Sequence, residues 1–379
     1  MSFILLVVAL CVVLYVYLVY PAVLYVVNNF CFNKYPVYSD YFPSVCIVIA
    51  AYNEENYVSD KISNSLNLDY PQDKLNVILV SDGSDDNTLA LAKGVKADNL
   101  KVIEVKERQG KANALNTALE HVKEEVIVFT DANVFLSDNA LKELVKPLQD
   151  NDIGCVSGQV VLKAMSDSEI LGEGMYMKYE RLMFSCESQI STMTGIDGGM
   201  FAIKKEYVEP IPVNTILDDM LIAMRVLLRK KKIKYNASAI AEEYVPASVA
   251  QEFKRKVRIA TGAFQLLPQV TALLNPLHNL PMFIFFVSHK VFRWLSPVFL
   301  MTIFITTAVN LDKPPFEILF YLQVVFYFIA LLGQLSTKLR NVSIVYIAYY
   351  FTVVNISMFI GLFKYLFGNH SVKWKKVNR

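Results

Sequence analysis

Charged residues are scarce in this chain of 379 residues. They make up 19% of it, against roughly a quarter in soluble globular proteins, while hydrophobic residues reach 54%. Disordered chains are poor in apolar residues, so this balance argues against intrinsic disorder. The net charge is only +2, and no overall field points to nucleic acid. The apolar surplus is therefore expected to be concentrated in part of the chain.

Cysteine, histidine and the common nucleotide-binding motifs are also sparse or missing. No CxxC pair occurs, and the four histidines show no metal-ligand spacing. An odd, scattered set of cysteines favours reduced thiols in a cytosol-facing protein over a disulfide scaffold or a zinc site. No GxGxxG follows the first strand pattern and no GxxxxGK[ST] occurs, so neither a dinucleotide fold nor a P-loop is supported. The five cysteines are Cys11, Cys31, Cys46, Cys155 and Cys186.

The apolar surplus lies at the two ends of the chain. Residues 2–27 contain no charged residue, and as a helix they would cross a hydrocarbon core of about 30 Å. No basic segment precedes them and no small-residue cleavage site follows, so we expect an uncleaved anchor and not a signal peptide. Three C-terminal runs have the length of membrane spans or come near it: residues 295–310, 316–332 and 344–363.

These features predict five segments. Prolines interrupt the apolar run at 264–286, which favours an amphipathic segment in the membrane interface over a span. Lys and Arg just before the C-terminal runs favour a cytoplasmic globular domain. Three crossings would then leave the tail outside, whereas its basic residues favour the cytoplasmic side, so the two signals conflict. The segments are a transmembrane anchor (1–28), a globular domain (33–250), an interfacial segment (251–293), a transmembrane bundle (294–367) and a basic tail (368–379).

The first half of the globular domain alternates strand and helix patterns. Strands are expected at 45–50, 76–80, 101–105 and 125–130, and helices at 54–66, 85–92 and 111–121. Repeated strand–helix units predict an α/β fold with a parallel sheet covered on both faces. Ligands of such sheets bind beyond the carboxyl ends of the strands. Polar or acidic triplets follow three of these strands: Tyr52-Asn53-Glu54, Asp82-Gly83-Ser84 and Asp131-Ala132-Asn133.

Six blocks, in order, resemble the membrane-anchored family 2 glycosyltransferases of the cellulose synthase-like superfamily. This resemblance implies a GT-A domain for nucleotide-diphospho-sugars between N-terminal and C-terminal transmembrane helices. It also implies an inverting transfer to a glycan or lipid-linked acceptor in surface polysaccharide assembly. The blocks are PSVCIVIAAYNE (43–54), ILVSDGSDDNT (78–88), QGKANALNTAL (109–119), VIVFTDAN (126–133), GIDGGMFAIKK (195–205) and LDDMLIAMR (217–225).

The resemblance assigns a donor-binding set along these blocks. Lys111 opens a helix and is placed to face a phosphate, although a solvated helix face explains it equally simply. Arg258 matches the arginine of the QxxRW motif of processive relatives, where it would grip the diphosphate; Ile259 replaces the tryptophan. The set is Tyr52, Glu54, Asp82, Lys111, Asn113, Asp131 and Arg258.

A divalent metal is implied at the triplet 131–133, which stands where the family carries its DxD motif. Mg²⁺ and Mn²⁺ take hard oxygen ligands and keep waters and substrate phosphates as the rest of their shell. Asp131 fits that role. Asn133 replaces the second acid and offers only a neutral amide oxygen.

Catalysis is assigned by the resemblance to an acidic pair. Asp219 is the expected general base for the acceptor hydroxyl, with Asp218 in support; helix capping by both acids is the simpler alternative. Metal and cations would stabilise the departing diphosphate, so no second acid is required. Asp197 and Gly198 are expected at the acceptor or at the sugar end of the donor, or else form a plain turn.

Two alternative functions remain open at this level. One is a processive polysaccharide synthase. The other is a non-catalytic membrane scaffold or transport subunit, which predicts loss of the metal or base carboxylates. The expected setting is a bacterial inner membrane with the catalytic domain cytoplasmic, lipid and membrane partner subunits as neighbours, and no nucleic acid.

Overall fold

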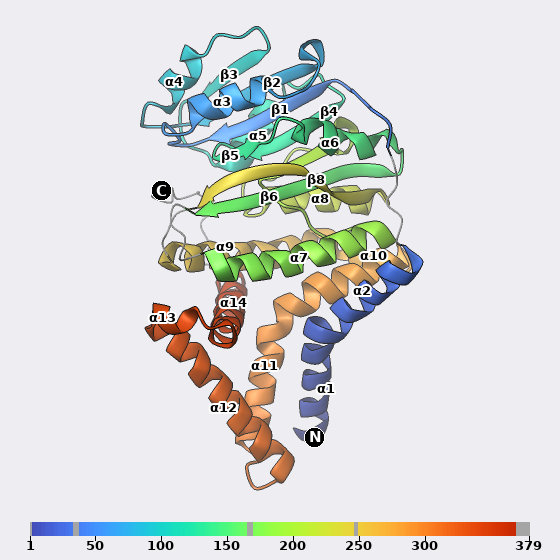
Figure 1. Ribbon diagram of the computed structural model, residues 1–379, viewed down its shortest axis with the longest axis vertical. Helices are drawn as coiled ribbons and strands as arrows, with labels where there is room; N and C mark the ends of the chain where they lie inside the picture. Colours follow the sequence, from blue (N-terminus) through green and yellow to red (C-terminus); the bar gives the residue numbers. More distant parts are fainter. Residues whose placement is uncertain (1, 33–37, 165–169, 246–248, 369–379) are drawn as a thin grey trace.

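The computed structural model describes residues 2–32, 38–164, 170–245 and 249–368. It is built in three layers (Figure 1): an α/β domain, a set of helices lying across beneath it, and long apolar helices that descend from that set. Residues 369–379 of the predicted basic tail lie outside the described residues.

One eight-stranded sheet forms the centre of the α/β domain. Its order is β3-β2-β1-β4-β7-β6-β8-β5. The first four strands in this order are parallel, as the strand–helix repeats predict. Their bounds are β1 Val45–Ala51, β2 Leu75–Asp82, β3 Leu100–Val105 and β4 Val126–Asp131.

The other half of the sheet, which lies outside the predicted strand–helix repeats, is mixed. Strand β7 runs antiparallel to both β4 and β6, and β5 runs antiparallel to β8, while β6 and β8 are parallel. The regular repeat ends there because α7 (Ile170–Ile190), between β6 and β7, lies beneath the sheet against the apolar helices (Figure 1). These strands are β5 Val134–Leu136, β6 Ile153–Ala164, β7 Met200–Lys204 and β8 Lys232–Val245.

Strand β1 shows how the sheet is stabilised. All seven of its residues are buried, and neighbours along the strand face opposite sides. Ile47 and Ile49 join one apolar cluster and Cys46 and Val48 the other. Full burial of each aliphatic side chain is worth roughly 1.5–3 kcal/mol. The helices that cover the two faces are α3 Val58–Leu66, α4 Thr88–Gly94, α5 Lys111–Leu119, α6 Ala140–Val145 and α8 Asp218–Leu228.

Among the described residues, four helices are long and apolar enough to cross a membrane. They cover Ser2–Cys31, Leu280–Ala308, Pro314–Leu335 and Ser343–Leu366. The second begins at Leu280, earlier than the expected 295, because Pro281 stands in its first turn, where proline is tolerated. These helices contain α1 Ser2–Leu14, α2 Tyr20–Cys31, α10 Leu280–Phe285, α11 Phe292–Ala308, α12 Pro314–Leu335 and α14 Ser343–Leu366.

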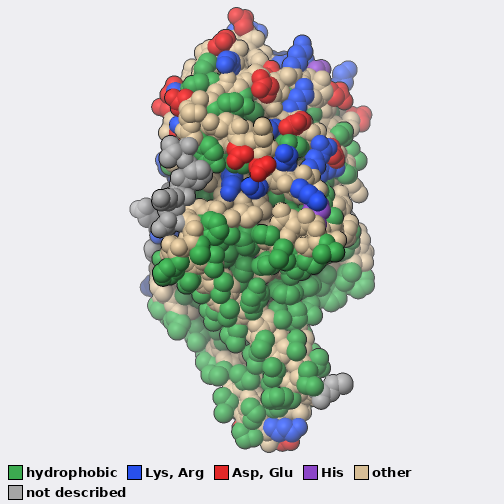
Figure 2. Space-filling view, turned by 90° about the vertical axis from the view of Figure 1, so that its right-hand side faces the viewer, with side chains coloured by type: hydrophobic (Ala, Val, Ile, Leu, Met, Phe, Trp, Pro, Cys, Tyr) green, Lys and Arg blue, Asp and Glu red, His purple; other side chains and the backbone are tan. Residues whose placement is uncertain are grey.

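The surface reflects this division. Figure 2 shows charged side chains spread over the α/β domain and a broad hydrophobic surface below it, with charge returning at the foot of the molecule. Ile318 and Leu322 of α12 are each 60% exposed. Exposed apolar surface of this extent marks a lipid-facing or protein-facing region.

A buried polar cluster joins the apolar helices to the domain above. The Tyr20 hydroxyl donates to Oε1 of Glu187 at 2.7 Å, and His289 Nδ1 lies 2.7 Å from the same oxygen. The other carboxylate oxygen of Glu187 accepts from the backbone N–H of Thr194 at 3.2 Å. Glu187 thus connects the first and second apolar helices to the segment that leads into Gly195–Gly199.

Candidate active site

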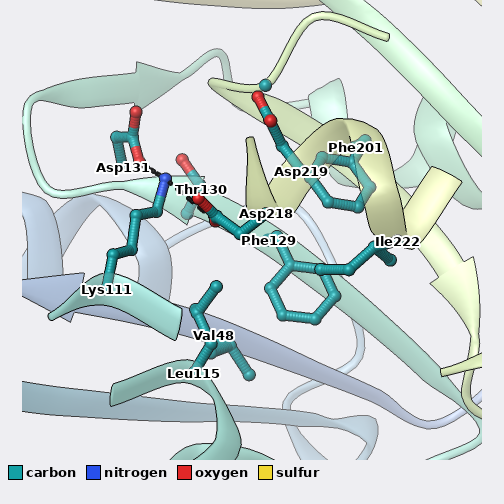
Figure 3. A pocket seen from close by; sticks show the side chains of 11 residues that line it. Val48, Lys111, Leu115, Phe129, Thr130, Asp131, Phe201, Asp218, Asp219 and Ile222 are labelled. Carbon is teal, nitrogen blue, oxygen red and sulfur yellow. Dashed lines mark hydrogen bonds and ion pairs between the residues drawn. The ribbon is translucent and has the colours of Figure 1, made fainter. Parts of the chain in front are cut away.

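The predicted site residues meet at the carboxyl end of β4. Lys111 from α5, Asp131 from β4, and Asp218 and Asp219 from α8 line one pocket (Figure 3). Because α8 begins at Asp218, both acids stand in its first turn. The remaining lining residues are Val48, Leu115, Phe129, Thr130, Gly198, Phe201 and Ile222.

Lys111 lies between two of the carboxylates. Its Nζ is 2.8 Å from Oδ1 of Asp131 and 3.6 Å from Oδ2 of Asp218. Burial by itself would lower the pKa of Lys111, but Asp131, Asp218 and Asp219 raise that pKa above its ordinary value. Lys111 is therefore charged, and the three acids leave the cluster with a net negative charge.

Asp219 is the carboxylate best suited to accept a proton. One oxygen accepts from the N–H of Met220 at 2.7 Å. The other oxygen faces Gly198 closely enough that a Cβ on that glycine would overlap it. Burial, and next the like charge of Asp218, raise the pKa of Asp219 to about 6. At pH 7 this group is mostly ionised and more basic than an ordinary aspartate.

Asp82 binds the loop that opens α5. Its two oxygens accept from the backbone N–H groups of Gln109, at 2.9 Å, and Gly110, at 2.7 Å. Gly110 has φ +105°, a conformation that favours glycine. Asp82 therefore sets the position of the turn from which Lys111 projects.

The other residues predicted to bind the donor lie at the same edge of the sheet, with the exception of Arg258. Glu54 is buried, and its N–H donates to the Thr88 hydroxyl at 2.7 Å. Asn113 lies in the first turn of α5. Arg258 is exposed on α9 (Val249–Leu266) and is not among the residues that line the pocket. It stands one turn before Gly262, which packs against Ile216 and Leu217 just ahead of α8.

Arg108 is a site residue that the sequence analysis missed. Its guanidinium lies over the ring of Tyr52, 3.8 Å from the centroid. Among the described residues, its Nε and Nη2 atoms are buried and have no hydrogen-bond partner. Unpaired buried donors are costly, so a polar ligand at this place would be favoured. Arg108 directly precedes the block that starts at Gln109, and this adjacency could have identified it from the sequence.

A second polar group consists of Asn133, Asp197 and Glu243. Asn133 Nδ2 donates to Oε1 of Glu243 at 3.2 Å. Asp197 accepts from the N–H groups of Val160, at 3.2 Å, and Gly199, at 3.4 Å. Burial and then the charge of Glu243 raise the pKa of Asp197 to about 7. Asp197 is thus held in place by backbone groups and is partly protonated near neutrality.

The donor set suits a hard cation only in part. Within the described residues, no three His, Cys, Asp or Glu side chains converge on one point. Asp131 supplies carboxylate oxygens, and the Asp131–Asp218 pair already holds one cationic group, that of Lys111. Such a set resembles magnesium and manganese sites that bind the ion with few protein ligands and complete its shell with substrate phosphates.

Comparison with known proteins agrees with this geometry. Residues 46–211 match the model of the family described as Glycosyl transferase family 2. The chain is 29% identical over 245 residues to poly-beta-1,6-N-acetyl-D-glucosamine synthase of Staphylococcus aureus, covering 62% of this chain and 58% of that protein. The Staphylococcus epidermidis protein of the same name is 27% identical over 232 residues, covering 59% and 55%. The chain thus spans just over half the length of these curated relatives.

A solved structure shares the whole architecture. It is the mannosyltransferase PcManGT from Pyrobaculum calidifontis, in complex with GDP-Man and Mn²⁺. The TM-score is 0.74 at 22% identity, covering 97% of this chain and 100% of that one. The α/β domain therefore has the GT-A fold of nucleotide-sugar transferases. Within that class, residues 46–211 match the family 2 glycosyltransferase model.

Proposed function

We propose that this protein is an inverting glycosyltransferase anchored in a membrane. It moves a sugar from a nucleotide-diphospho-sugar to a glycan or lipid-linked acceptor in the assembly of a surface polysaccharide. The observation that carries the proposal is the placement of Asp219, a half-buried base with a raised pKa, in one pocket with Lys111 and Asp131. The polysaccharide role is supported by the names of the curated relatives.

The residues divide the reaction between them. Asp219 takes the proton of the acceptor hydroxyl as that oxygen attacks the anomeric carbon, and the bond to the diphosphate breaks on the opposite side. Lys111 holds the negative charge that develops on the departing diphosphate. Arg258 is proposed to join it there, although in this structure it is exposed on α9 and outside the pocket lining. Asp218 orients Lys111, and Asp197 and Gly198 border the space for the sugar or the acceptor.

Asp131 and Asn133 are the residues that would hold Mg²⁺ or Mn²⁺. When bound, such an ion neutralises diphosphate charge and so improves the leaving group. Asp131 offers an anionic oxygen. Asn133 offers its amide oxygen, since its amide nitrogen is directed to Glu243. The solved neighbour with Mn²⁺ supports a divalent ion in this fold.

The nucleotide lies, in this proposal, along the edge formed by Tyr52, Glu54 and Asp82. Arg108 stands above Tyr52 with two buried donors that a nucleotide oxygen would satisfy. Donors that differ in base and in sugar test this placement. UDP- and GDP-sugars are therefore the first compounds to compare.

We propose a bacterial inner membrane as the setting, with the α/β domain in the cytoplasm. Lys254, Arg255, Lys256 and Arg258 lie on α9, just above the apolar helices, and positive charge accumulates on the cytoplasmic side of membrane proteins. Membrane partner subunits are part of the same proposal.

The alternatives have less support. A non-catalytic scaffold would be expected to lack the acids at the pocket, yet Asp131, Asp218 and Asp219 all line it. A processive synthase would be expected to carry an aromatic residue where this chain has Ile259 on α9.

The decisive experiment is a donor screen on the full-length protein in nanodiscs. Nucleoside diphosphate release from UDP- and GDP-sugars is measured with Mn²⁺ or Mg²⁺ and a membrane-extract acceptor. We expect transfer from one donor and a loss of about 10²–10⁴-fold in Asp219→Asn, the usual contribution of a general base. The proposal fails if no donor is consumed, or if Asp219→Asn turns over like the wild type. Product length on a defined acceptor separates single addition from polymerisation.

A further inference from the structure

Lys61 is a lysine buried in the core of the domain. It lies on α3, has 0% exposure, and is among the largest of the fully buried side chains within the described residues. An amine in such a place is unfavourable unless it is well hydrogen-bonded. Its contacts therefore indicate why the position carries a lysine.

Both partners of Lys61 lie at the ends of the same short turn. Its Nζ donates to Oγ1 of Thr130 at 3.0 Å and to the backbone carbonyl of Val134. Thr130 directly precedes the triplet Asp131–Asn133, and Val134 directly follows it. One side chain from α3 thus contacts both residues that flank the triplet. Asp131, within the triplet, lines the pocket (Figure 3).

The contact does not depend on the charge of the amine. Burial lowers the pKa of Lys61 to about 7, and the nearby charge of Asp131 opposes that shift. A neutral amine has two N–H groups and an ammonium has three, so either form can donate to both oxygens. The two ends of the turn are therefore held in both protonation states.

We propose that Lys61 is a positioning residue for the donor-metal turn at 131–133. It keeps the two ends of that turn at the spacing at which Asp131 and Asn133 can share one divalent ion. This inference rests on the proposed function, because it assumes that the turn binds a metal together with a nucleoside diphosphate. Residues that orient metal ligands without touching the ion commonly contribute 10–100-fold to metal affinity.

A purely structural role for Lys61 predicts something else. Asn64, one turn later on α3, also ties this helix to the strand after the turn. Its Nδ2 donates to the carbonyl of Leu136 at 2.8 Å, and its Oδ1 accepts from the N–H of Leu136 at 3.0 Å. Asn64 therefore makes the same helix-to-β5 connection without contacting the ends of the turn, which makes it a matched control.

The test uses the full-length protein in nanodiscs and the variants Lys61→Met, Thr130→Val and Asn64→Ala. Free Mn²⁺ is titrated by electron paramagnetic resonance in the presence of UDP and, separately, GDP, and thermal unfolding is followed in parallel. We expect Lys61→Met to raise the apparent Kd for Mn²⁺ by about tenfold or more. Thr130→Val, which removes one of the two acceptors with little change in volume, raises it less. Asn64→Ala lowers the unfolding temperature and leaves the Kd within about twofold.

The outcomes separate the two proposals. If wild type and Lys61→Met bind Mn²⁺ equally, or if Asn64→Ala weakens binding as much as Lys61→Met, the role of Lys61 is overturned and the proposed function stands. If Lys61→Met does not fold, Thr130→Val decides, and an unchanged Kd there overturns the inference. If the wild type itself binds no Mn²⁺ with either nucleotide, the metal part of the proposed function is overturned, and the inference with it.

Discussion

A methyl group on the Cα of Gly198 would overlap Oδ2 of Asp219. No Cβ can approach a carboxylate oxygen so closely, so the residue at 198 controls where the proposed base stands. The φ angle of Gly198 is not in the left-handed region, and the constraint is therefore one of space and not of backbone conformation. This relationship links the glycine-rich segment before β7 to the first turn of α8.

Gly198→Ala is expected to displace Asp219 and to lower kcat by about 10²-fold, since small misplacements of a catalytic group have effects of this size. Donor KM should change less than kcat, because the added methyl group acts on the position of the base. Steady-state kinetics at saturating donor check this. Gly94→Ala is the control: nothing lies within 4 Å of a Cβ there, so that variant should behave like the wild type. Equal kinetics for Gly198→Ala and Gly94→Ala would contradict the placement of the base.

The pH dependence of kcat/KM should report Asp219. A general base must be deprotonated, so the rate rises with pH through about 6 and levels off above it. Asp218→Asn removes the neighbouring charge that raises the pKa of Asp219, so the rising limb should move to lower pH. Lys111→Met removes a charge that lowers this pKa, and the limb should move to higher pH. A limb that stays in place in both variants would argue that another group is titrating.

Arg108→Met should raise the donor KM by about tenfold, with a smaller effect on kcat. The guanidinium stacks on Tyr52 and has two buried donors without partners, which a nucleotide would satisfy. Competition by UDP and GDP against the donor measures the same loss without turnover. Arg229→Met is a matched control, since Arg229 also lies over a tyrosine, Tyr207, at 5.9 Å. Inhibition constants that are identical in both variants would exclude Arg108 from the nucleotide site.

Asp197→Asn should change how stability depends on pH. Burial raises the pKa of Asp197 to about 7, well above the value of about 4 in an unfolded chain. The folded state then holds a proton that the unfolded state releases, so stability falls as pH rises between these values. The wild type should lose several degrees more in unfolding temperature between pH 5 and pH 8 than the variant, which does not ionise. Parallel melting curves for the two proteins would show that Asp197 does not carry this shift.

Much of the framework could be predicted because it depends on local patterns. Asp82 and Asp131 were expected near each other since each follows a buried parallel strand, and the carboxyl ends of such strands share one edge. The apolar runs could be located because span length is a property of a continuous segment. The start of the second apolar helix was harder to predict. A proline in the interior of a helix interrupts it, but Pro281 stands in the first turn, where proline is tolerated.

Local sequence patterns were enough to predict the class of fold, the apolar helices and the acids at the strand ends, because each of these depends on residues that are neighbours in the chain. Four features came from the folded structure alone: the sheet is mixed, Arg108 covers Tyr52, Lys61 contacts both residues that flank the turn at 131–133, and Gly198 faces Asp219. These pairs are far apart in the chain or on different elements. Their contacts arise from packing and from the need to satisfy buried polar groups, and no local pattern encodes either.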